Sequence, residues 1–190
     1  YGYTAVSNGV TYNGFVNDED ESVLGGSLTY TFSYIPGCDT GLYSITPQGQ
    51  SSGNYNITFK AGTLTVEKRE VTLTWDGYEN RTAGDGKAVT ATAGNLYGSD
   101  AIKVTVSGGD AQTSGTHTAT ATGLTGAKAG NYKLPTTGLT QEYTIGLAKQ
   151  TLTFEKPDTL PSVNYGDTYV NPAKNDRADG GAVTYTSSDT

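Results

Sequence analysis

Apolar and polar residues alternate along much of the chain, as they do in strands with one buried face. In residues 27–34, one side of an extended backbone carries Leu28, Tyr30, Phe32 and Tyr34. Three further alternating sets are Tyr55, Ile57, Phe59; Ile102, Val104, Val106; and His117, Ala119, Ala121. Few stretches show helical spacing. The pattern therefore predicts an all-β chain.

Two local signals refine this picture. Ala61 and Gly62 separate the run 55–59 from the run 62–66, which predicts a hairpin between those two runs. The acidic residues Asp18–Glu21 precede a Gly25-Gly26 pair. Acidic residues in a first turn and a glycine at the end are helix signals, so we expect a single helical turn there.

The chain also repeats itself. The sequence Gly53-Asn54-Tyr55 recurs as Gly130-Asn131-Tyr132, and apolar positions after it recur at one fixed spacing. The pairs are Leu64/Tyr143, Val66/Ile145, Leu73/Leu152 and Trp75/Phe154. Elsewhere the spacing drifts slightly, with Gly14-Phe15 matching Asn95-Leu96, Val23 matching Val104, and Gly41–Ile45 matching Gly115–Ala119. Such repeats are typical of tandem arrays of modules, and small insertions in surface turns account for the drift.

A change of alternation marks the module boundaries. Leu64 and Val66 are even-numbered, whereas Leu73 and Trp75 are odd-numbered, and charged residues 67–70 lie between them. The same change occurs between Ile145 and Leu152. We expect the chain to leave one core and enter the next at these points, so that each module closes its own small interior. The predicted division is module 1 at 1–68, with its start truncated, module 2 at 69–149, and a partial module 3 at 150–190.

Composition narrows the classes of function. The 190 residues include 26 glycines and 14 tyrosines, with a hydrophobic fraction of 34%. Twelve basic against 19 acidic residues give a net charge of −7, which disfavours binding to nucleic acid or to anionic membranes. A single cysteine cannot form an internal disulfide bond. We expect no nucleic-acid partner, no membrane insertion of this fragment, and a monomer.

No residue set predicts catalysis, a cofactor or a metal. His117 is the single histidine and stands where the sister module has Tyr43, so we interpret it as a strand residue. Cys38 lies in the turn sequence Pro36–Asp39, where an exposed thiol could form an intermolecular disulfide. Asp18–Glu21 offers oxygen ligands for Ca²⁺ but lacks the spacing of a calcium loop. Asp85, Asp100 and Asp110 stand singly beside glycine or serine and are interpreted as turn residues.

Two other possibilities concern aromatic and lysine side chains. Trp75 and Phe154 occupy equivalent alternating positions and are expected to pack in cores, although exposed aromatic residues could form a sugar-binding platform. An isopeptide crosslink would need a lysine, an asparagine and an acid buried together. The lysines considered are Lys60, Lys68, Lys87 and Lys133.

The repeated segments resemble the MBG/YDG-type tandem repeats of bacterial cell-surface and adhesin proteins. In the first module the matching segments are Tyr1-Gly2, Gly14–Asn17 to Val23-Leu24, and 53–59 leading into 62–66. In the second they are 85–89, 115–120 and 130–135, although Ala83-Gly84 stand where the family often has tyrosine before Asp-Gly. Residues 181–189 resemble generic bacterial Ig-like repeats. The resemblance implies a secreted, surface-attached protein, and no catalytic residues come with it.

Together these observations predict tandem small antiparallel β modules. An Ig-like sandwich is favoured, and a β-grasp-like unit with one short helix is the alternative, which a helix of ten or more residues within 14–26 would support. The predicted function is a non-catalytic structural or adhesive repeat, a stalk or spacer of a bacterial surface protein. Another part of the parent protein would contact a host glycan or protein. The alternative is a carbohydrate- or glycoprotein-binding module, and an enzyme is not expected.

Overall fold

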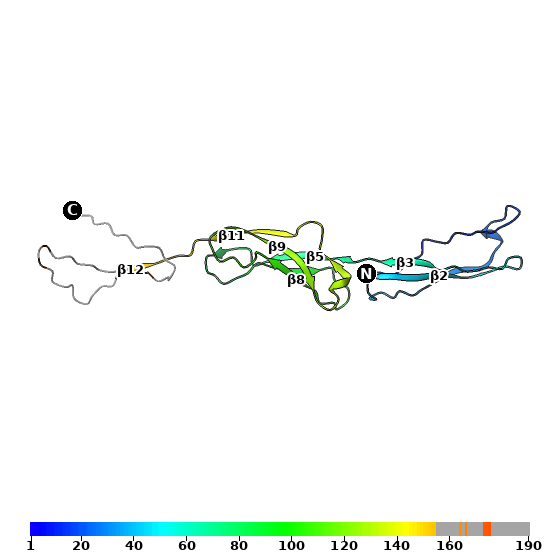
Figure 1. The fold of residues 1–190 in the computed structure, drawn as a ribbon, viewed down its shortest axis with the longest axis horizontal. Coiled ribbons are helices and arrows are strands. Elements are labelled where there is room, and N and C mark those ends of the chain that lie inside the picture. Colours follow the sequence, from blue (N-terminus) through cyan, green and yellow to red (C-terminus); the bar gives the residue numbers. More distant parts are fainter. Residues whose placement is uncertain (155–163, 165, 167–172, 176–190) are drawn as a thin grey trace.

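The computed structural model describes residues 1–154, 164, 166 and 173–175, and in this part of the chain the fold is all-β, as predicted. We call residues 1–68 the first unit and residues 69–149 the second unit. Figure 1 shows the two units one after the other along the long axis, the first in blue to cyan and the second in green to yellow. The N-terminus lies where the two units meet.

The first unit contains one antiparallel sheet of three strands in chain order. These are β1 (Gly25–Phe32), β2 (Gly41–Ser51) and β3 (Gly62–Val66). The pairing of β1 with β2 shifts register between Gly26 and Thr29. Glycine is required at this bulge because Gly49 has a φ of +92° and a Cβ there would collide with the Ser27 carbonyl oxygen.

The second unit is built around a six-stranded sheet in the order β5-β7-β8-β9-β11-β6. Its strands are β5 (Thr72–Asp76), β6 (Arg81–Thr82), β7 (Thr90–Gly94), β8 (Lys103–Ser107), β9 (Gly115–Thr125) and β11 (Thr140–Gly146). The neighbours are antiparallel, except that β6 runs parallel to β11.

Shorter elements complete the described structure. β4 (Arg69–Glu70) pairs in parallel with β10 (Tyr132–Lys133), which directly follows the 3₁₀ turn η2 (Ala129–Asn131). β12 (Leu152–Phe154) pairs with β13 (Ala173–Asn175). Most of the predicted third module, including the Ig-like segment 181–189, lies outside the described residues.

Strand register supports the internal repeat. In the first unit, Gly41 of β2 faces Val66 of β3, and Tyr43 faces Leu64. In the second unit, the corresponding residues face each other in the same way, Gly115 with Ile145 and His117 with Tyr143. The strands β1-β2-β3 thus match β8-β9-β11 in order and direction, and the pairing of β2 with β3 matches that of β9 with β11 in register.

One of the predicted equivalences is wrong. Gln50 of β2 and Leu124 of β9 occupy corresponding positions. Gln50 pairs with Gly26 of β1 and Leu124 pairs with Val104 of β8, so Gly26 is the residue that corresponds to Val104. Val23 instead ends the 3₁₀ turn η1 (Glu21–Val23). The first unit has extra residues at this turn that the second unit lacks, and they displace the sequence match between Val23 and Val104.

The helical content of residues 14–26 decides between the two fold predictions. The predicted single turn is present as η1, and Asp20 caps it by accepting a hydrogen bond of 2.9 Å from the Ser22 amide. No helix of ten residues occupies this fully described segment. The fold therefore agrees with a sandwich-like β unit and does not support a β-grasp unit.

The predicted hairpin over 55–66 is also wrong. Residues 55–61 lie in no strand, and β3 pairs with β2 instead. The alternation in 55–59 has a different cause: Tyr55 and Ile57 are half-buried because they face an open groove of the first unit. The pattern was interpreted as a strand because a half-buried extended loop has the same period of two.

The buried residues form two clusters, and one of them crosses the unit boundary. It joins buried residues of the first unit, Tyr1, Tyr34 and Val66, to buried residues of the second unit, Val71, Ala93, Ile102 and Tyr132. The other cluster consists of Val89, Ala119, Tyr143 and Ile145. The expectation of separate interiors is therefore wrong. The charged residues 67–70 allow the chain to cross between the units while Val66 and Val71 on either side remain in one core.

Candidate functional site

The junction between the two units contains a tyrosine–carboxylate network. Asp100 lies in the loop between β7 and β8, and one of its oxygens, Oδ2, accepts hydrogen bonds from two hydroxyls. The Tyr1 hydroxyl donates across the junction at 2.8 Å, and the Tyr132 hydroxyl donates at 2.7 Å. The Tyr132 hydroxyl also accepts a bond of 2.9 Å from the Tyr97 amide. The first unit thus supplies one of the two hydroxyl donors to an acid of the second.

The same arrangement occurs inside the first unit. The Tyr55 hydroxyl donates to Glu19 and accepts a bond of 3.3 Å from the Val16 amide. Val16 and Glu19 precede their counterparts, Tyr97 and Asp100, by one common spacing. The backbone turn is also shared, because the Glu19 amide bonds to the Val16 carbonyl at 3.1 Å and the Asp100 amide bonds to the Tyr97 carbonyl at 3.1 Å. What differs is the added hydroxyl from Tyr1, which only the second network receives within the described residues.

Packing and charge keep the junction tyrosines protonated. The Tyr1 ring lies edge-on to Tyr97 and Tyr132, with centroid separations of 5.7 and 5.4 Å. Burial, followed by the nearby Asp100 carboxylate, raises the pKa of both the Tyr1 and the Tyr132 hydroxyls. Both groups therefore remain hydrogen-bond donors at neutral pH.

A second set of contacts at the junction is centred on Asn131, the middle residue of the repeated Gly-Asn-Tyr sequence. Its side chain is buried, accepts a bond of 2.8 Å from the Thr40 amide, and donates one of 2.8 Å to Asp39. Lys128 forms an ion pair with the same Asp39 oxygen at 2.7 Å. The sister residue Asn54 is exposed. The repeated asparagine is thus a clamp in the second unit, holding the loop before β2 of the first.

A further contact across the junction is made by Arg69. Its guanidinium donates to the Asn95 carbonyl at 2.8 Å and to the Asn95 side chain at 2.9 Å. It also lies 4.7 Å from the ring centre of Tyr3 in the first unit. This cation–π contact is partly exposed, so it adds orientation more than stability.

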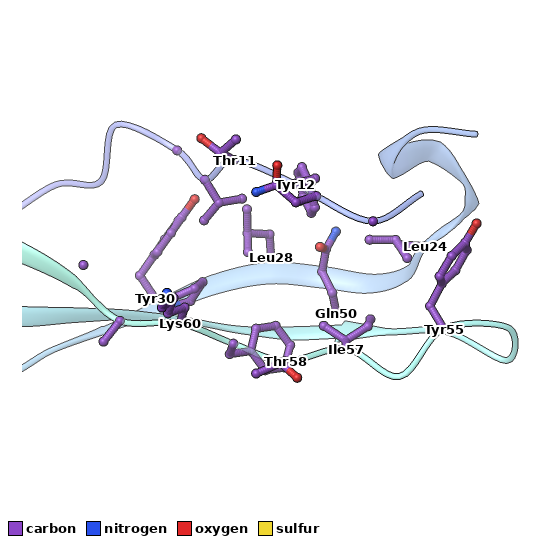
Figure 2. Close-up of a pocket in the computed structure, with 18 of the residues that line it drawn as sticks. Thr11, Tyr12, Leu24, Leu28, Tyr30, Gln50, Tyr55, Ile57, Thr58 and Lys60 are labelled. Atoms are coloured by element: carbon purple, nitrogen blue, oxygen red, sulfur yellow. The ribbon is translucent and has the colours of Figure 1, made fainter. Parts of the chain in front are cut away.

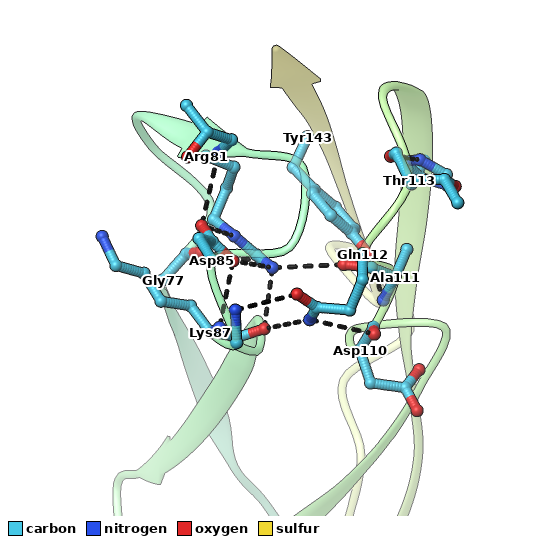
Figure 3. Close-up of polar contacts among 12 residues, drawn as sticks. Gly77, Arg81, Asp85, Lys87, Asp110, Ala111, Gln112, Thr113 and Tyr143 are labelled. Carbon is cyan, nitrogen blue, oxygen red and sulfur yellow. Dashed lines mark hydrogen bonds and ion pairs between the residues drawn. The ribbon is translucent and has the colours of Figure 1, made fainter. Parts of the chain in front are cut away.

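A polar network of the second unit surrounds Arg81, as Figure 3 shows. The Arg81 side chain is fully buried and contacts Asp85 through Nε–Oδ2 at 2.8 Å and Nη2–Oδ1 at 3.0 Å. Nη2 also donates to the Lys87 carbonyl at 2.7 Å and to the Ala111 carbonyl at 3.2 Å. The Tyr143 ring lies 5.5 Å from the guanidinium carbon.

This network is chemically closed. The Arg81 guanidinium, together with the Lys87 and Thr82 amides, lowers the pKa of the Asp85 carboxyl to about 2. A carboxylate so acidic is a poor general base at neutral pH, and it already accepts from Arg81 and from backbone amides. The pair therefore stabilises the loops around β6.

A backbone hydrogen bond next to this pair has an equivalent at the junction. The Ala83 amide donates to the Gly146 carbonyl at 2.9 Å, and the Tyr1 nitrogen donates to the Glu67 carbonyl at 2.8 Å. Gly146 follows Glu67 by the same spacing that separates Ile145 from Val66. Ala83 of the second unit therefore occupies the position that Tyr1 has in the first.

The first unit also has an open groove of about 840 Å³, shown in Figure 2. It lies between the extended segment around Thr11 and Tyr12 and the sheet strand that carries Leu28 and Tyr30. Ile57 and Thr58 belong to a further segment that lines it. The groove is mixed in character, with aromatic, aliphatic and amide side chains.

The structure places the predicted site residues as strand, turn and core residues. His117 lies in β9 opposite Tyr143, and its Nε2 is 2.8 Å from the Thr113 carbonyl oxygen. Cys38 is half-buried in the predicted turn and packs against the shared cluster. Trp75 packs against the cluster of the second unit and donates through Nε1 to the Gly138 carbonyl at 3.2 Å. The side chain of Phe154 lies outside the described residues.

The considered calcium and isopeptide sites gain no support. In the part of the chain that the structure describes, no three His, Cys, Asp or Glu side chains are grouped as metal ligands. Lys60, Lys68, Lys87 and Lys133 are all exposed, whereas the crosslinking reaction needs a buried lysine. Likewise, among the described residues no helix is both long and apolar enough to cross a membrane.

Sequence reasoning missed the roles of the residues in these polar networks. It interpreted Asp85 and Asp100 as turn residues, considered Glu19 only within the acidic run Asp18–Glu21, used Asn131 only as part of the repeat, and did not mention Arg81. A signal existed for two of these, because Glu19 and Asp100 share the spacing that already relates Gly14-Phe15 to Asn95-Leu96. The pairing of Arg81 with Asp85 had no comparable signal.

Comparison with known protein families gives a match to part of the chain. The family model of the MBG domain (YGX type) matches residues 1–65. A search of the curated proteins found no match, and a search of the solved structures found none either. The MBG match covers the segment that contains Tyr1-Gly2, the Tyr55–Glu19 network and most of β3. Over residues 1–65, the chain therefore matches the MBG domain of the YGX type, which confirms the resemblance to MBG-type repeats for this segment.

Proposed function

We propose that the chain is a non-catalytic structural repeat, a spacer or stalk segment of a bacterial cell-surface protein. Its units would be 1–68 and 69–149, followed by a partial unit at 150–190. The match of residues 1–65 to the MBG domain supports this setting. In the proposal, the array lies outside the cell and holds another part of the parent protein toward a host glycan or protein.

The observation that carries the proposal is the shared core at the junction. Tyr1 is 6% exposed, yet its ring and hydroxyl contact residues of the second unit, including Tyr132 and Asp100. A joint that buries side chains and satisfies their polar groups resists bending, because bending would expose apolar surface and break those hydrogen bonds. Such a joint transmits direction along an array, which is what a spacer needs.

Residual dipolar couplings of amide groups in a weakly aligned sample test this rigidity. We expect one alignment tensor to fit the couplings of residues 25–66 and 72–146 together. The double variant Asp100→Ala with Asn131→Ala removes the carboxylate that accepts the Tyr1 hydrogen bond and the asparagine that holds the loop before β2. It should give two alignment tensors of different magnitude, one for each unit. Two unequal tensors in the unaltered chain would contradict the proposal. Protease treatment of intact cells tests the location, since an exposed array releases peptides of this chain without lysis.

A second candidate is a carbohydrate- or glycoprotein-binding module. The groove of the first unit supports it, because Tyr12, Phe15 and Phe59 line the same space as Asn13 and Gln50. Aromatic faces beside amide groups are suited to sugars. A glycan array probed with the chain tests this candidate, and binding that is lost on Phe59→Ala would favour it over a purely structural role.

A further inference from the structure

The chain enters the second unit through β4 and leaves it at the end of β11. Arg69 of β4 follows the first unit, and Gly146 of β11 precedes β12. Figure 1 shows the first unit and β12 on opposite sides of the second unit along the long axis. Four antiparallel steps in the order β5-β7-β8-β9-β11 make β5, which continues β4, parallel to β11. Tension along the chain therefore pulls the first and last strands of the unit past each other along their own axes.

Parallel pairings join the first and last segments of the unit at both ends. At the entry, β4 pairs with β10, the segment that leads into β11, and the Val71 amide donates to the Lys133 carbonyl at 3.0 Å. At the exit, β6 pairs with the end of β11, and the Ala83 amide donates to the Gly146 carbonyl at 2.9 Å. A load applied at the start of β4 thus reaches the segment of β10 and β11 directly, without passing through the middle strands β7, β8 and β9.

Side chains attach both pairings to the body of the unit. At the β4–β10 pairing, Val71 and Tyr132 are buried in the shared core, and Glu70 and Lys133 form an ion pair of 3.4 Å across it. β6 has only two residues, yet its Arg81 side chain is fully buried and donates to carbonyls in the loops before β7 and β9. The network around Arg81 therefore anchors the short strand past which β11 would have to slide.

We propose that the second unit bears load, and that the β4–β10 and β6–β11 pairings form a mechanical clamp against tension between Arg69 and Gly146. Because the pull runs along the strands, the hydrogen bonds of each pairing share the load and must break together. Strands that are peeled apart from one end lose their bonds one at a time. Forced unfolding is governed by the unfolding rate, so this geometry slows extension without needing a higher equilibrium stability. The inference rests on the proposed spacer function and deepens it, since it says which contacts keep a loaded array from lengthening.

Pulling the full chain in two directions with optical tweezers tests the clamp without weakening it. In a Cys38→Ser background, handles at Lys68→Cys and Leu147→Cys, both at exposed positions, load the second unit from end to end. Handles at Lys103→Cys and Thr125→Cys, which are exposed and directly paired, peel β8 from β9. At one loading rate, the end-to-end unfolding force should be at least twice the peeling force, with a release of up to about 280 Å of extended chain. An end-to-end force equal to or below the peeling force would overturn the clamp.

Two proline variants locate the resistance within the unit. Val71→Pro removes the amide that donates to the Lys133 carbonyl, and Val89→Pro removes an amide that donates to the Gly109 carbonyl at 2.7 Å. The two valines are 1% and 2% exposed, but Val89 lies outside both clamp pairings. Under a constant end-to-end load, Val71→Pro should unfold at least tenfold faster than Val89→Pro, whereas denaturant unfolding without load should show comparable losses of stability. Equal unfolding rates under load would overturn the clamp.

These outcomes remain separable from each other and from the spacer function. The comparison of two pulling directions needs neither proline variant, so a variant that does not fold leaves the proposal open to refutation. A low end-to-end force beside a single alignment tensor would remove the clamp and leave the spacer function standing. Two unequal tensors beside a high end-to-end force would do the reverse, because the tensors report the unloaded junction and the force reports the second unit.

Discussion

Removing one oxygen atom at the junction tests how much the shared network stabilises the chain. In Tyr132→Phe, the ring that is 2% exposed remains in place while its hydroxyl is lost. The loss removes the 2.7 Å bond to the Asp100 carboxylate and leaves the half-buried Tyr97 amide without its 2.9 Å acceptor. A hydrogen bond to a charged group contributes about 1.5–3 kcal/mol, and we expect a total loss of about 2–3 kcal/mol.

Tyr143→Phe is the matched control. Tyr143 is 3% exposed in the other cluster, and its hydroxyl also makes two bonds, donating to the Gly108 carbonyl at 2.8 Å and accepting from the Ala111 amide at 3.3 Å. Both partners are uncharged and the second bond is long, so its loss should cost about 1 kcal/mol. The contrast between the two variants isolates the charge-assisted bond at the junction from the general effect of removing a buried hydroxyl.

Denaturant unfolding followed by far-UV circular dichroism measures both variants. We expect Tyr132→Phe to lower the unfolding midpoint more than Tyr143→Phe at an unchanged slope. Adding Tyr1→Phe to Tyr132→Phe should cost more than the two single changes together, because Asp100 then loses both of its hydroxyl donors. Equal midpoints for the two single variants, or strict additivity in the double variant, would refute the argument that the network joins the units energetically.

Three further predictions follow from other contacts. Asn131→Ala should lower the free energy of unfolding by about 1–2 kcal/mol because Thr40 loses its acceptor, whereas Asn54→Ala at the exposed sister position should change it by less than about 0.5 kcal/mol in the same denaturant assay. The Asp85 carboxyl has a pKa of about 2, below its ordinary value of 3.8, so its stabilising effect is complete above pH 4 and is lost as the pH falls toward 2. Acid titrations of the free energy of unfolding should therefore show a shallower loss over this range in Asp85→Asn than in the unaltered chain. Parallel curves for the two proteins would contradict the assignment. Gly49→Ala should destabilise the first unit by about 1–3 kcal/mol because of its positive φ and the nearby Ser27 carbonyl, with Gly53→Ala, where a Cβ meets open space, as the neutral control in thermal unfolding.

The sequence predicted the strands well where a sheet has one buried face. Tyr30 and Phe32, like Ala119 and Ala121, point inward as their alternation indicates. It failed at 55–59, where an extended loop facing a groove has the same period. Period alone reports which side chains are covered and does not report whether the backbone has a partner strand.

The junction could not be predicted, because its residues are distant in sequence and ordinary in their local setting. Asp100 beside a serine is a normal turn residue, and its role depends on Tyr1, which is 99 positions away. The alternation change at 67–70 marked the crossing correctly but gave no information on whether Val66 and Val71 pack in separate cores or in one. That distinction depends on how closely two units approach, which turn length and sheet geometry determine.

The position shared by Tyr1 and Ala83 has a consequence for how an array of such units would flex. A phenol at this point reaches an acid of its neighbour, whereas a methyl group is too short to do so. Units that carry tyrosine would make stiff joints, and units that carry alanine would make compliant ones. The distribution of these two residue types along a long array would then set where it bends under load.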